Sequence, residues 1–463
     1  MSHYPPSAYA SVPSRLADDR LALSAVVVLY LGAFFSPVST SLGQLFQFAA
    51  LIVGILFVRR HWSALRNSPL LWLPVGFALW VIIRTAMAAL WEDPARAAEH
   101  WDEMTTWFKS AAVPVLIYGL ALAATGRWLR HGIVVLGLLL VGYMIFFVAT
   151  TSWSGTLEAL HTSARQEPDL GFRTAALVLP GLAAGALFAT IHMFSGISGP
   201  QDRRGTRIVT GVLLALFFCF FVAIMVASKS RNSWLTLIIL LSVSAVFALW
   251  VFRSRLWQMR VPLLAGALTI MLGTGAITTY AWSAIGERWS ETAETVQQTM
   301  ALPFGGRVED LAEDPVGIRV AYWAFGWERF LDRPLVGRGA ADQRHLTDEY
   351  PIPPQLEGRT DTYHNSHIDI LLRFGLVGYL LFAATILLIL LEAWRRLQTP
   401  GAARTIALFT LGFVPAMAFW AMNAQIIQRF SVEHFYGLVL ALMAASHFAR
   451  LTSYPDERSH EDE

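Results

Sequence analysis

Titratable side chains gather in one short segment, residues 361–369, which leads into a long apolar stretch. The segment reads Asp-Thr-Tyr-His-Asn-Ser-His-Ile-Asp, and polar groups at the start of a membrane helix are costly unless they are used. An imidazole gains and loses a proton near neutral pH, so His364 is a candidate general base. Asn365 is a candidate orienting neighbour. The alternative interpretation is a histidine at the membrane interface that only caps a helix.

The same segment also admits a metal site. His364 and His367 are three residues apart, and Asp361 or Asp369 could add a carboxylate ligand. The motif is short and no further pair of ligands stands out in the sequence, so we expect no metal. His367 is then a candidate support for His364 or a contact for an acceptor molecule. We expect Asp369 to pair with Arg373, one helical turn later.

Basic residues in two other segments could bind a phosphate ester. Lys229 and Arg231 lie in a turn between two apolar stretches, and Arg319 lies in a separate polar segment. An arginine can bind two phosphate oxygens at once and keeps its charge at any working pH. Each residue alone could be an anchor to lipid headgroups. Their convergence on one side of a membrane favours a phosphate site, and Arg84 and Arg173 are further candidates to line it.

The composition requires these residues to belong to a membrane protein. Of the 463 residues, 55% are hydrophobic and 15% are charged. The mean hydropathy of +0.49 exceeds what the core of a water-soluble domain of this length needs. The single cysteine, Cys219, excludes an intrachain disulfide and a metal held by several thiolates. We therefore predict an all-α polytopic membrane protein with no nucleic-acid partner.

About twelve apolar segments are long enough to cross roughly 30 Å of hydrocarbon as helices. We place them at residues 21–37, 42–58, 69–91, 110–125, 132–150, 172–194, 208–228, 233–252, 261–282, 366–391, 405–424 and 432–449. Arginines collect in one set of connecting loops and in both tails, which predicts that this side is cytoplasmic. His364, Arg319 and Arg231 then face away from the cytoplasm.

One connecting segment is unlike the others. Residues 283–363 form a long loop on the non-cytoplasmic side, and loops of that length usually carry function. Within this loop the pattern predicts a helix over Pro315–Phe330, with Trp323 and Trp327 on the same side as Arg319. A helix with such an aromatic side would lie at the membrane surface.

Taken together, these segments resemble the O-antigen ligase and polymerase family of bacterial membrane glycosyltransferases. The resemblance is carried, in this order, by Ser230-Arg231 at the start of a span, Arg319 with Trp323 and Phe330, Asp332-Arg333-Pro334-Leu335-Val336-Gly337 with Gly339, His364-Asn365-Ser366-His367-Ile368, and Gly375-Leu376-Val377-Gly378. It covers most of the chain, including the apolar spans and the one long loop. The chain departs from the family pattern at His367, where an apolar or aromatic residue is frequent.

The resemblance implies a GT-C-like glycosyltransferase in the bacterial inner membrane, with both termini cytoplasmic and a periplasmic active site. Its donor would be a glycan linked through pyrophosphate to undecaprenol, and its acceptor a sugar hydroxyl of lipid A-core in lipopolysaccharide biosynthesis. His364 would be the general base, while Arg231 and Arg319, assisted by Lys229, would hold the pyrophosphate. The transfer would invert the anomeric carbon and need no metal or other cofactor, and the partners would be the two substrates and membrane lipids.

The predicted layout follows from these assignments: a cytoplasmic tail at 1–20, the first nine spans within 21–282, the periplasmic loop at 283–363, the last three spans within 364–450 and an acidic cytoplasmic tail at 451–463. Other functions remain open on the sequence. An O-antigen polymerase or a protein O-oligosaccharyltransferase would use the same donor with another acceptor. A transporter of lipid-linked sugars is less favoured, because transporters usually place ionisable groups or broken helices near the middle of the bilayer, whereas these titratable groups gather at one face.

Overall fold

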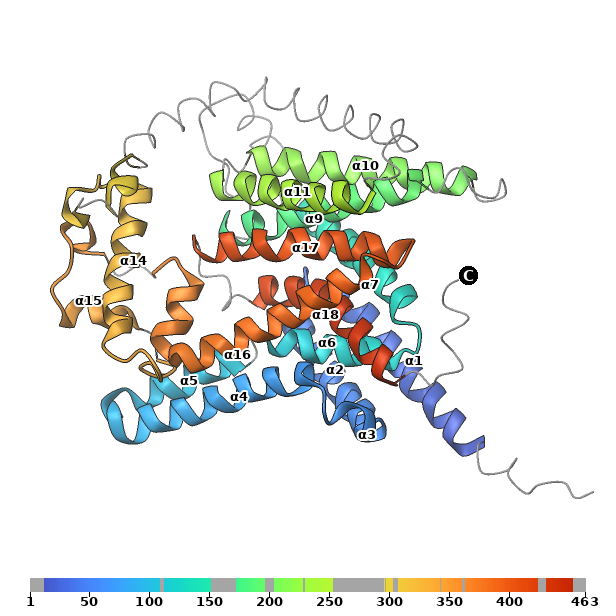
Figure 1. Cartoon of the computed structure of the whole chain (residues 1–463), viewed down its shortest axis with the longest axis horizontal. Coiled ribbons are helices and arrows are strands. Elements are labelled where there is room, and N and C mark those ends of the chain that lie inside the picture. Colours follow the sequence, from blue (N-terminus) through green and yellow to red (C-terminus); the bar gives the residue numbers. More distant parts are fainter. Residues whose placement is uncertain are drawn as a thin grey trace, which may run out of the picture.

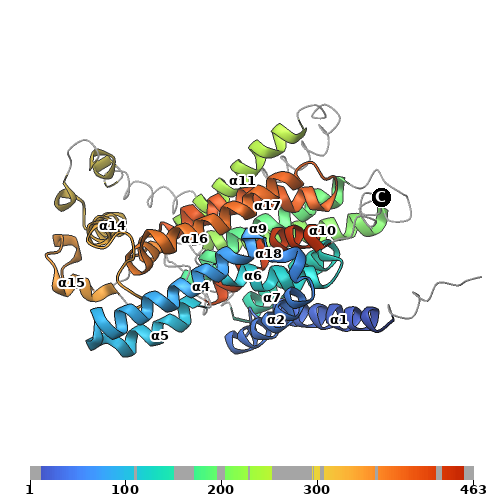
Figure 2. The same ribbon diagram turned by 60° about the horizontal axis from the view of Figure 1, so that its bottom comes forward.

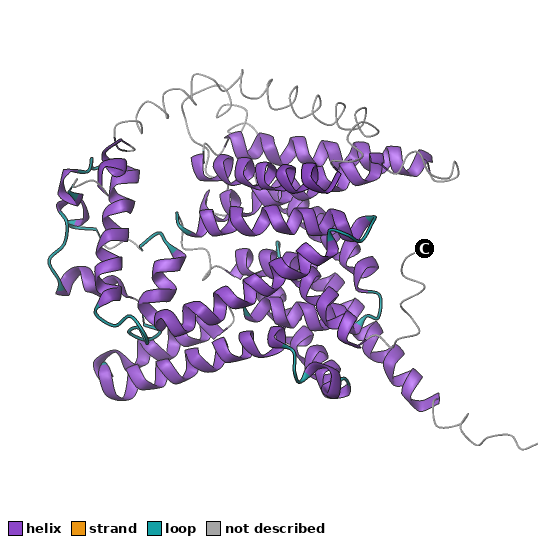
Figure 3. Ribbon diagram, in the orientation of Figure 1, coloured by secondary structure: helices purple, strands orange, loops and turns teal. Residues whose placement is uncertain are grey.

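The computed structural model describes residues 12–108, 112–150, 172–195, 204–227, 230–252, 295, 297–302, 307–341, 343–359, 363–423 and 430–452. Within these residues the backbone forms helices and turns and no β-strand (Figure 3). The helices of the membrane bundle are α1 (Val12–Phe35), α2 (Thr40–Arg60), α4 (Pro69–Met87), α6 (Val113–Ala124), α7 (Trp128–Thr150), α9 (Phe172–Ser195), α10 (Arg204–Ala227), α11 (Arg231–Phe252), α16 (Ser366–Arg396), α17 (Ala402–Ala421) and α18 (Phe430–Thr452). The remaining helices are α3 (Trp62–Leu65), the π-helix η1 (Ala88–Glu92), η2 (Pro94–Arg96), α5 (Ala97–Phe108), η5 (Val308–Asp310), α14 (Pro315–Leu331), η6 (Gln343–His345), α15 (Leu346–Glu349) and η7 (Pro354–Leu356).

Nine helices within the described residues are long and apolar enough to cross a membrane. They correspond to nine of the predicted spans. Two further predicted spans are represented by the shorter apolar helices Arg20–Phe35 and Val178–Met193, and the predicted span 261–282 lies outside the described residues. The chain is therefore a multi-pass membrane protein, and its described part is built from helices.

A short central helix organises one half of the bundle. Every residue of α6 is buried, and α1, α2, α4, α7 and α18 pack around it. A second group contains α9, α10, α11 and α17, and α16 connects the two groups through α4, α17 and α18 (Figure 1). Small residues permit the close approach of these helices. A Cβ atom at Gly119, for example, would overlap Ala444 of α18.

The two ends of the bundle differ in charge and in what covers them. α14 and α15 lie beyond one end, which we call the loop end, beside the end of α4 and the start of α16 (Figure 1, Figure 2). The opposite end, which we call the basic end, carries arginines at the starts of α7, α10 and α17 and at the ends of α2, α16 and α18: Arg59, Arg60, Arg127, Arg130, Arg207, Arg395, Arg396, Arg404 and Arg450. The positive-inside rule predicts this distribution if the basic end faces the cytoplasm.

The helix predicted in the long loop is α14, and local chemistry sets its start. The Asp314 carboxylate accepts hydrogen bonds from the N–H groups of Val316 and Gly317, at 2.9 and 2.7 Å. Asp314 is therefore the N-cap, and Pro315 occupies the first turn, where its missing N–H costs nothing.

α14 packs on the protein mainly through a side other than the Trp323–Trp327 side, which we predicted to lie at the membrane surface. Trp327 is 50% exposed, whereas Tyr322 and Phe325 are buried. The reason is tertiary, because α14 packs against the start of α16 and against η7. The placement of the exposed side at the membrane surface stays a prediction.

Candidate active site

The residue before His364 anchors it to the long loop. The Tyr363 hydroxyl donates a hydrogen bond to the carbonyl oxygen of Gln343 at 2.9 Å, and its ring stacks on Phe325 with the ring centroids 6.4 Å apart. His364 itself has a φ of +49°, and among the described residues no other non-glycine has a positive φ. Such a conformation costs energy, and residues held in it cluster at functional sites.

The residue after His364 anchors it to α16. Asn365 is the N-cap of this helix, and its side-chain oxygen accepts hydrogen bonds from the N–H groups of His367 and Ile368, at 3.0 and 3.2 Å. Because Asn365 is also buried, the backbone on this side of His364 is tied to the first turn of the helix. The orienting role of Asn365 towards His364 stays a prediction.

Loss of this cap is expected to destabilise the protein. Asn365→Ala removes the acceptor and should lower the free energy of unfolding by about 1 kcal/mol, as N-cap deletions typically do. Asn365→Asp keeps an acceptor oxygen at the same position and should retain most of the stability. Thermal unfolding of the two variants in detergent measures the difference. Equal melting temperatures would contradict the capping role.

α14 brings Arg319 towards His364. Tyr322 follows Arg319 by one helical turn, and its ring centroid lies 6.4 Å from that of His364 and 6.1 Å from that of Tyr363. The Arg319 guanidinium donates a hydrogen bond to the carbonyl oxygen of Pro315 at 3.1 Å. The structure therefore brings together the helix that carries Arg319 and the segment that carries His364, which are separate in the sequence.

Arg231 lies at the same end of the bundle on another helix. α11 begins at Arg231 at the loop end (Figure 1) and packs on α17. α17 in turn contacts the candidate segment, because the His367 ring donates from Nε2 to the carbonyl oxygen of Ala418 at 3.0 Å. Lys229 and the side chains of Arg231 and Arg173 lie outside the described part of the structure.

His367 has partners of its own on α16 and α17. Besides the bond to Ala418, its Nδ1 accepts a hydrogen bond from the Tyr379 hydroxyl at 3.2 Å. His367 and Tyr379 line an apolar cavity of about 240 Å³ between α16, α17 and α18, together with Phe382 and Met417. The histidine that departs from the family pattern thus lies at the polar end of a hydrophobic cavity.

The predicted pairing of Asp369 with Arg373 is confirmed. The Arg373 guanidinium donates from Nε to Asp369 Oδ1 at 2.9 Å, and both side chains are buried. It also donates to the carbonyl oxygens of Ala340 and Ala341 in the long loop. Because Asp369 is engaged by a guanidinium, it is a poor metal ligand, and Asp361 lies outside the described residues.

α16 is broken at Gly375, and residues 334–339 of the long loop dock into the break. We call this segment the docked turn. Gly375 has φ +65° and ψ −170°, far from helical values. Four backbone hydrogen bonds join the turn to the break: Arg338 N to Leu372 O at 2.7 Å, Gly339 N to Arg373 O at 2.8 Å, Leu376 N to Pro334 O at 2.8 Å and Val377 N to Leu335 O at 3.2 Å. These bonds satisfy groups that an intact helix would have paired internally.

Side chains of α4 satisfy further carbonyl groups at the break. Trp80 donates from Nε1 to the carbonyl oxygen of Phe374 at 2.8 Å. Arg84 donates from Nη2 to the carbonyl oxygen of Gly337 at 2.8 Å and to Glu92 at 2.6 Å. Arg84 was a candidate to line the phosphate site, but its side chain is fully buried. We assign it to holding the docked turn.

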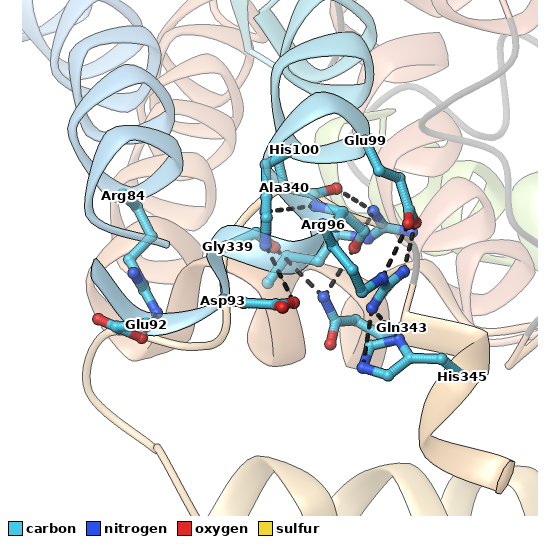
Figure 4. A network of polar contacts seen from close by, with 12 residues as sticks. Arg84, Glu92, Asp93, Arg96, Glu99, His100, Gly339, Ala340, Gln343 and His345 are labelled. Atoms are coloured by element: carbon cyan, nitrogen blue, oxygen red, sulfur yellow. Dashed lines mark hydrogen bonds and ion pairs between the residues drawn. The ribbon is translucent and has the colours of Figure 1, made fainter. Parts of the chain in front are cut away.

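A hairpin formed by η1, η2 and α5 holds the same part of the loop from the other side, as Figure 4 shows. His100 accepts a hydrogen bond at Nδ1 from the N–H of Ala341 at 3.0 Å. Arg96 donates to Glu99 at 2.8 Å and contacts the ring of His345 at 2.8 Å. The loop is therefore fixed between this hairpin and α16. Because the Tyr363 hydroxyl is bonded to Gln343 of the loop, the loop also fixes the residue that precedes His364.

Sequence reasoning missed Tyr363, Trp80 and the role of Arg84. The sequence did contain one signal for the docked turn: Gly337 and Gly375 both belong to motifs that carry the family resemblance. Their positive φ values, +71° and +65°, are conformations that glycine adopts at little cost.

Fold and site together define a class of multi-pass membrane protein. Its long loop docks into the break of α16. The docking brings His364 and the helix that carries Arg319 together at the loop end of the bundle. Residues 214–383 match the family described as O-antigen ligase, and a comparison with curated proteins gave no match. The matched region contains Arg231, Arg319, the docked turn and His364. The match over this region supports membership of the O-antigen ligase and polymerase family and a glycosyltransferase-like function in lipopolysaccharide biosynthesis.

Proposed function

We propose that the chain is an O-antigen ligase. It transfers O-antigen polysaccharide from undecaprenyl pyrophosphate to a sugar hydroxyl of lipid A-core at the periplasmic face. The observation that carries this proposal is the conformation of His364, held at a positive φ between Tyr363 and Asn365 and beside the helix of Arg319. A fixed base beside a helix that carries a cation suits a reaction in which the acceptor hydroxyl loses a proton and the donor releases an anionic leaving group.

The reaction uses each of these groups once. His364 takes the proton of the acceptor hydroxyl, and the hydroxyl oxygen attacks the anomeric carbon of the donor. The bond between that carbon and the pyrophosphate oxygen breaks with inversion, and undecaprenyl pyrophosphate leaves with the electron pair. Arg231 and Arg319, assisted by Lys229, stabilise the growing negative charge.

The cavity beside His367 supports a donor with a long hydrocarbon chain. Its wall is formed by apolar side chains of α16, α17 and α18, among them Phe382, Met417 and Leu440. Its volume of about 240 Å³ lies below the roughly 300–1,000 Å³ of pockets that enclose a whole small ligand. It suits a section of a polyprenyl chain, with the rest of the chain in the bilayer.

The position of the helix break favours an enzyme over a transporter. Transporters place broken helices near the middle of the bilayer, where they line the transport path. Here Gly375 follows the start of α16 by only nine residues, at the loop end, and protein backbone fills the break. The break fixes the loop instead of opening a path.

Reconstitution tests the proposal. The purified protein in lipid vesicles receives an undecaprenyl-pyrophosphate-linked glycan and purified lipid A-core, and we expect lipopolysaccharide that carries the glycan. Glycan extended on the lipid carrier would instead identify a polymerase, and glycan on Ser or Thr of an added periplasmic protein would identify a protein O-oligosaccharyltransferase. Failure to consume the donor with any of these acceptors would refute transferase activity.

Arg319→Lys is expected to lower the rate of transfer about tenfold to a hundredfold in this assay. Lysine keeps the charge but loses the planar fork that binds two phosphate oxygens, and a hydrogen bond to a charged group carries that much stabilisation. Arg307→Lys is the matched control, because Arg307 lies in the same loop and is exposed, and its ion-pair partner among the described residues is Glu309. Equal rates for the two variants would leave Arg319 as a headgroup anchor.

A further inference from the structure

A second apolar cavity lies in the half of the bundle away from His364. It has a volume of about 310 Å³ and lies between α7, α9, α10, α17 and α18. Its wall runs from residues near the middle of α7 and α9, such as Leu140 and Leu182, to residues near the starts of α10 and α17 and the end of α9, and α18 adds Phe435 and Val439. Because α7, α10 and α17 begin at the basic end and α9 finishes there, the cavity extends from the middle of the bundle towards the basic end. We call it the α7–α10 cavity.

The α7–α10 cavity lies where the two groups of helices meet and is open towards lipid. α7 packs on α1, α6 and α18, whereas α10 packs on α9 and α11. Ile133 of α7 lines the cavity and is 42% exposed, and Gly137 lines it on the same outward side. Apolar cavities of this kind do not hold water well, because water would lose its hydrogen bonds there. A hydrocarbon chain from the surrounding bilayer fits both the chemistry and the position of the opening.

The polar side chains of the cavity gather at the basic end. Among the lining residues only His192, Thr210 and Thr405 have polar side chains, and they lie in the last turn of α9, the second turn of α10 and the first turn of α17. His192 and Thr405 are joined by a hydrogen bond of 3.2 Å between Nδ1 and Oγ1. The cavity is therefore amphipathic along its length, with apolar walls and a polar mouth.

Positive charge surrounds this mouth. Each of the three cavity-lining helices that begin at the basic end carries an arginine within one turn of a lining residue: Arg130 precedes Ile133 on α7, Arg207 precedes Thr210 on α10 and Arg404 precedes Thr405 on α17. The sequences of α7, α9, α10 and α17 contain no Asp or Glu, so the charge that these helices themselves bring to the mouth is positive. Arg404 also donates to the neutral carbonyl oxygen of Leu397.

We propose that the α7–α10 cavity binds one acyl chain of an anionic phospholipid of the leaflet at the basic end, with the lipid phosphate held at the mouth by Arg130, Arg207 and Arg404. The apolar walls take the chain, and the arginines select the negative headgroup. A polyprenyl pyrophosphate substrate is a poorer fit, because its charged group would then lie at the end of the bundle opposite to His364. The cavity is a lipid site separate from the proposed active site.

Photocrosslinking tests this site in the full-length protein. Nanodiscs of neutral phosphatidylcholine are doped with a phosphatidylglycerol that carries a diazirine in one acyl chain, and labelled peptides are mapped by mass spectrometry after irradiation. We expect labelling to concentrate in residues 133–140, 181–193 and 402–409, and to exceed that from a phosphatidylcholine probe with the same acyl diazirine. Labelling spread evenly over all lipid-facing helices would overturn the proposal, as would equal labelling by both probes.

A cavity-filling variant gives the sharpest comparison. Gly185 lines the cavity, and a Cβ atom there meets no other atom within 4 Å, so the side chain of Gly185→Phe can start into the cavity and should fill it. Its labelling should fall to the level of the exposed residues of α2. Gly205→Phe is the matched control, because Gly205 also faces open space but lies outside the lining.

If Gly185→Phe does not fold, Gly137→Leu serves in its place, since Gly137 also faces open space within the lining. Undiminished labelling in a folded cavity-filling variant would refute the site.

The headgroup contact is tested with a charge variant. Arg207→Gln should reduce the preference for the phosphatidylglycerol probe over the phosphatidylcholine probe about fivefold, the contribution typical of one arginine at an anionic surface. Arg66→Gln, on the same end but away from the cavity, should leave the preference unchanged. An unchanged preference in Arg207→Gln would remove Arg207 from the site.

Discussion

Replacing His364 by alanine is expected to lower the rate of glycan transfer by about two to four orders of magnitude while the protein stays folded and inserted. A positioned base contributes that much to a reaction in which a proton leaves in the transition state. The acceptor hydroxyl is a weak nucleophile, and no other imidazole occupies this position in the described structure, since His367 is bound to Ala418 and Tyr379. The reconstituted assay with purified substrates measures the loss.

The positive φ of His364 allows the chemical role to be separated from a structural one. His364→Gly removes the imidazole and also relieves the backbone strain, because glycine adopts a φ of +49° freely. We expect this variant to be at least as stable as the wild type and as inactive as His364→Ala, and added imidazole to restore part of the rate. His61→Ala, on a histidine at the basic end, is the control. Near-normal transfer by the glycine variant would exclude His364 as the base.

Gly375→Ala is expected to release the docked turn and abolish most of the transfer. A Cβ atom at this position would overlap the carbonyl oxygen of Leu335, and an alanine must also adopt a φ of +65°. A small shift of the backbone cannot relieve both the overlap and the unfavourable φ. The docked turn must therefore leave the break and lose the four hydrogen bonds that join it to α16. The segment of His364 then loses its support through Gln343 and Tyr363.

A second glycine separates backbone strain from docking. Gly126 has a φ of +70°, but a Cβ atom there meets nothing within 4 Å. Gly126→Ala should therefore show only the left-handed strain of about 1–2 kcal/mol. Gly375→Ala should show a larger fall in melting temperature and faster cleavage by trypsin after Arg338, which is followed by Gly339. If the two variants shift the melting temperature equally and neither exposes the loop to trypsin, the docking is not important for stability.

The docked turn gives a physical meaning to two motifs that are weak when taken separately. Asp332 to Gly337 and Gly375 to Gly378 are about forty residues apart, yet their backbones are bonded to each other. Each glycine faces the backbone of the other segment, because a Cβ atom at Gly337 would overlap Arg373 and one at Gly375 would overlap Leu335. The two motifs form one structural unit, and its effect is to connect the long loop with the start of α16, where His364 lies.

The sequence by itself determined the properties that depend on short stretches of chain. Apolar length predicted most of the membrane helices, and the arginine distribution predicted the contrast between the basic and loop ends. The helix α14 and the pairing of Asp369 with Arg373 were also predicted, because capping and i, i+4 neighbours act within one or two turns. His364 was singled out for the same reason, as a titratable group where a span should become apolar.

Only the tertiary structure decided which groups meet across the chain. Arg84 binds the carbonyl oxygen of Gly337, which lies 253 residues away, so its assignment to the turn could not be read from its neighbours. The buried side of α14 was set by α16 and not by the spacing of Trp323 and Trp327. The partners of His367 on α17 were equally remote in the sequence. Burial requires every polar backbone group to find a partner, and which distant group supplies that partner follows from packing and not from local pattern.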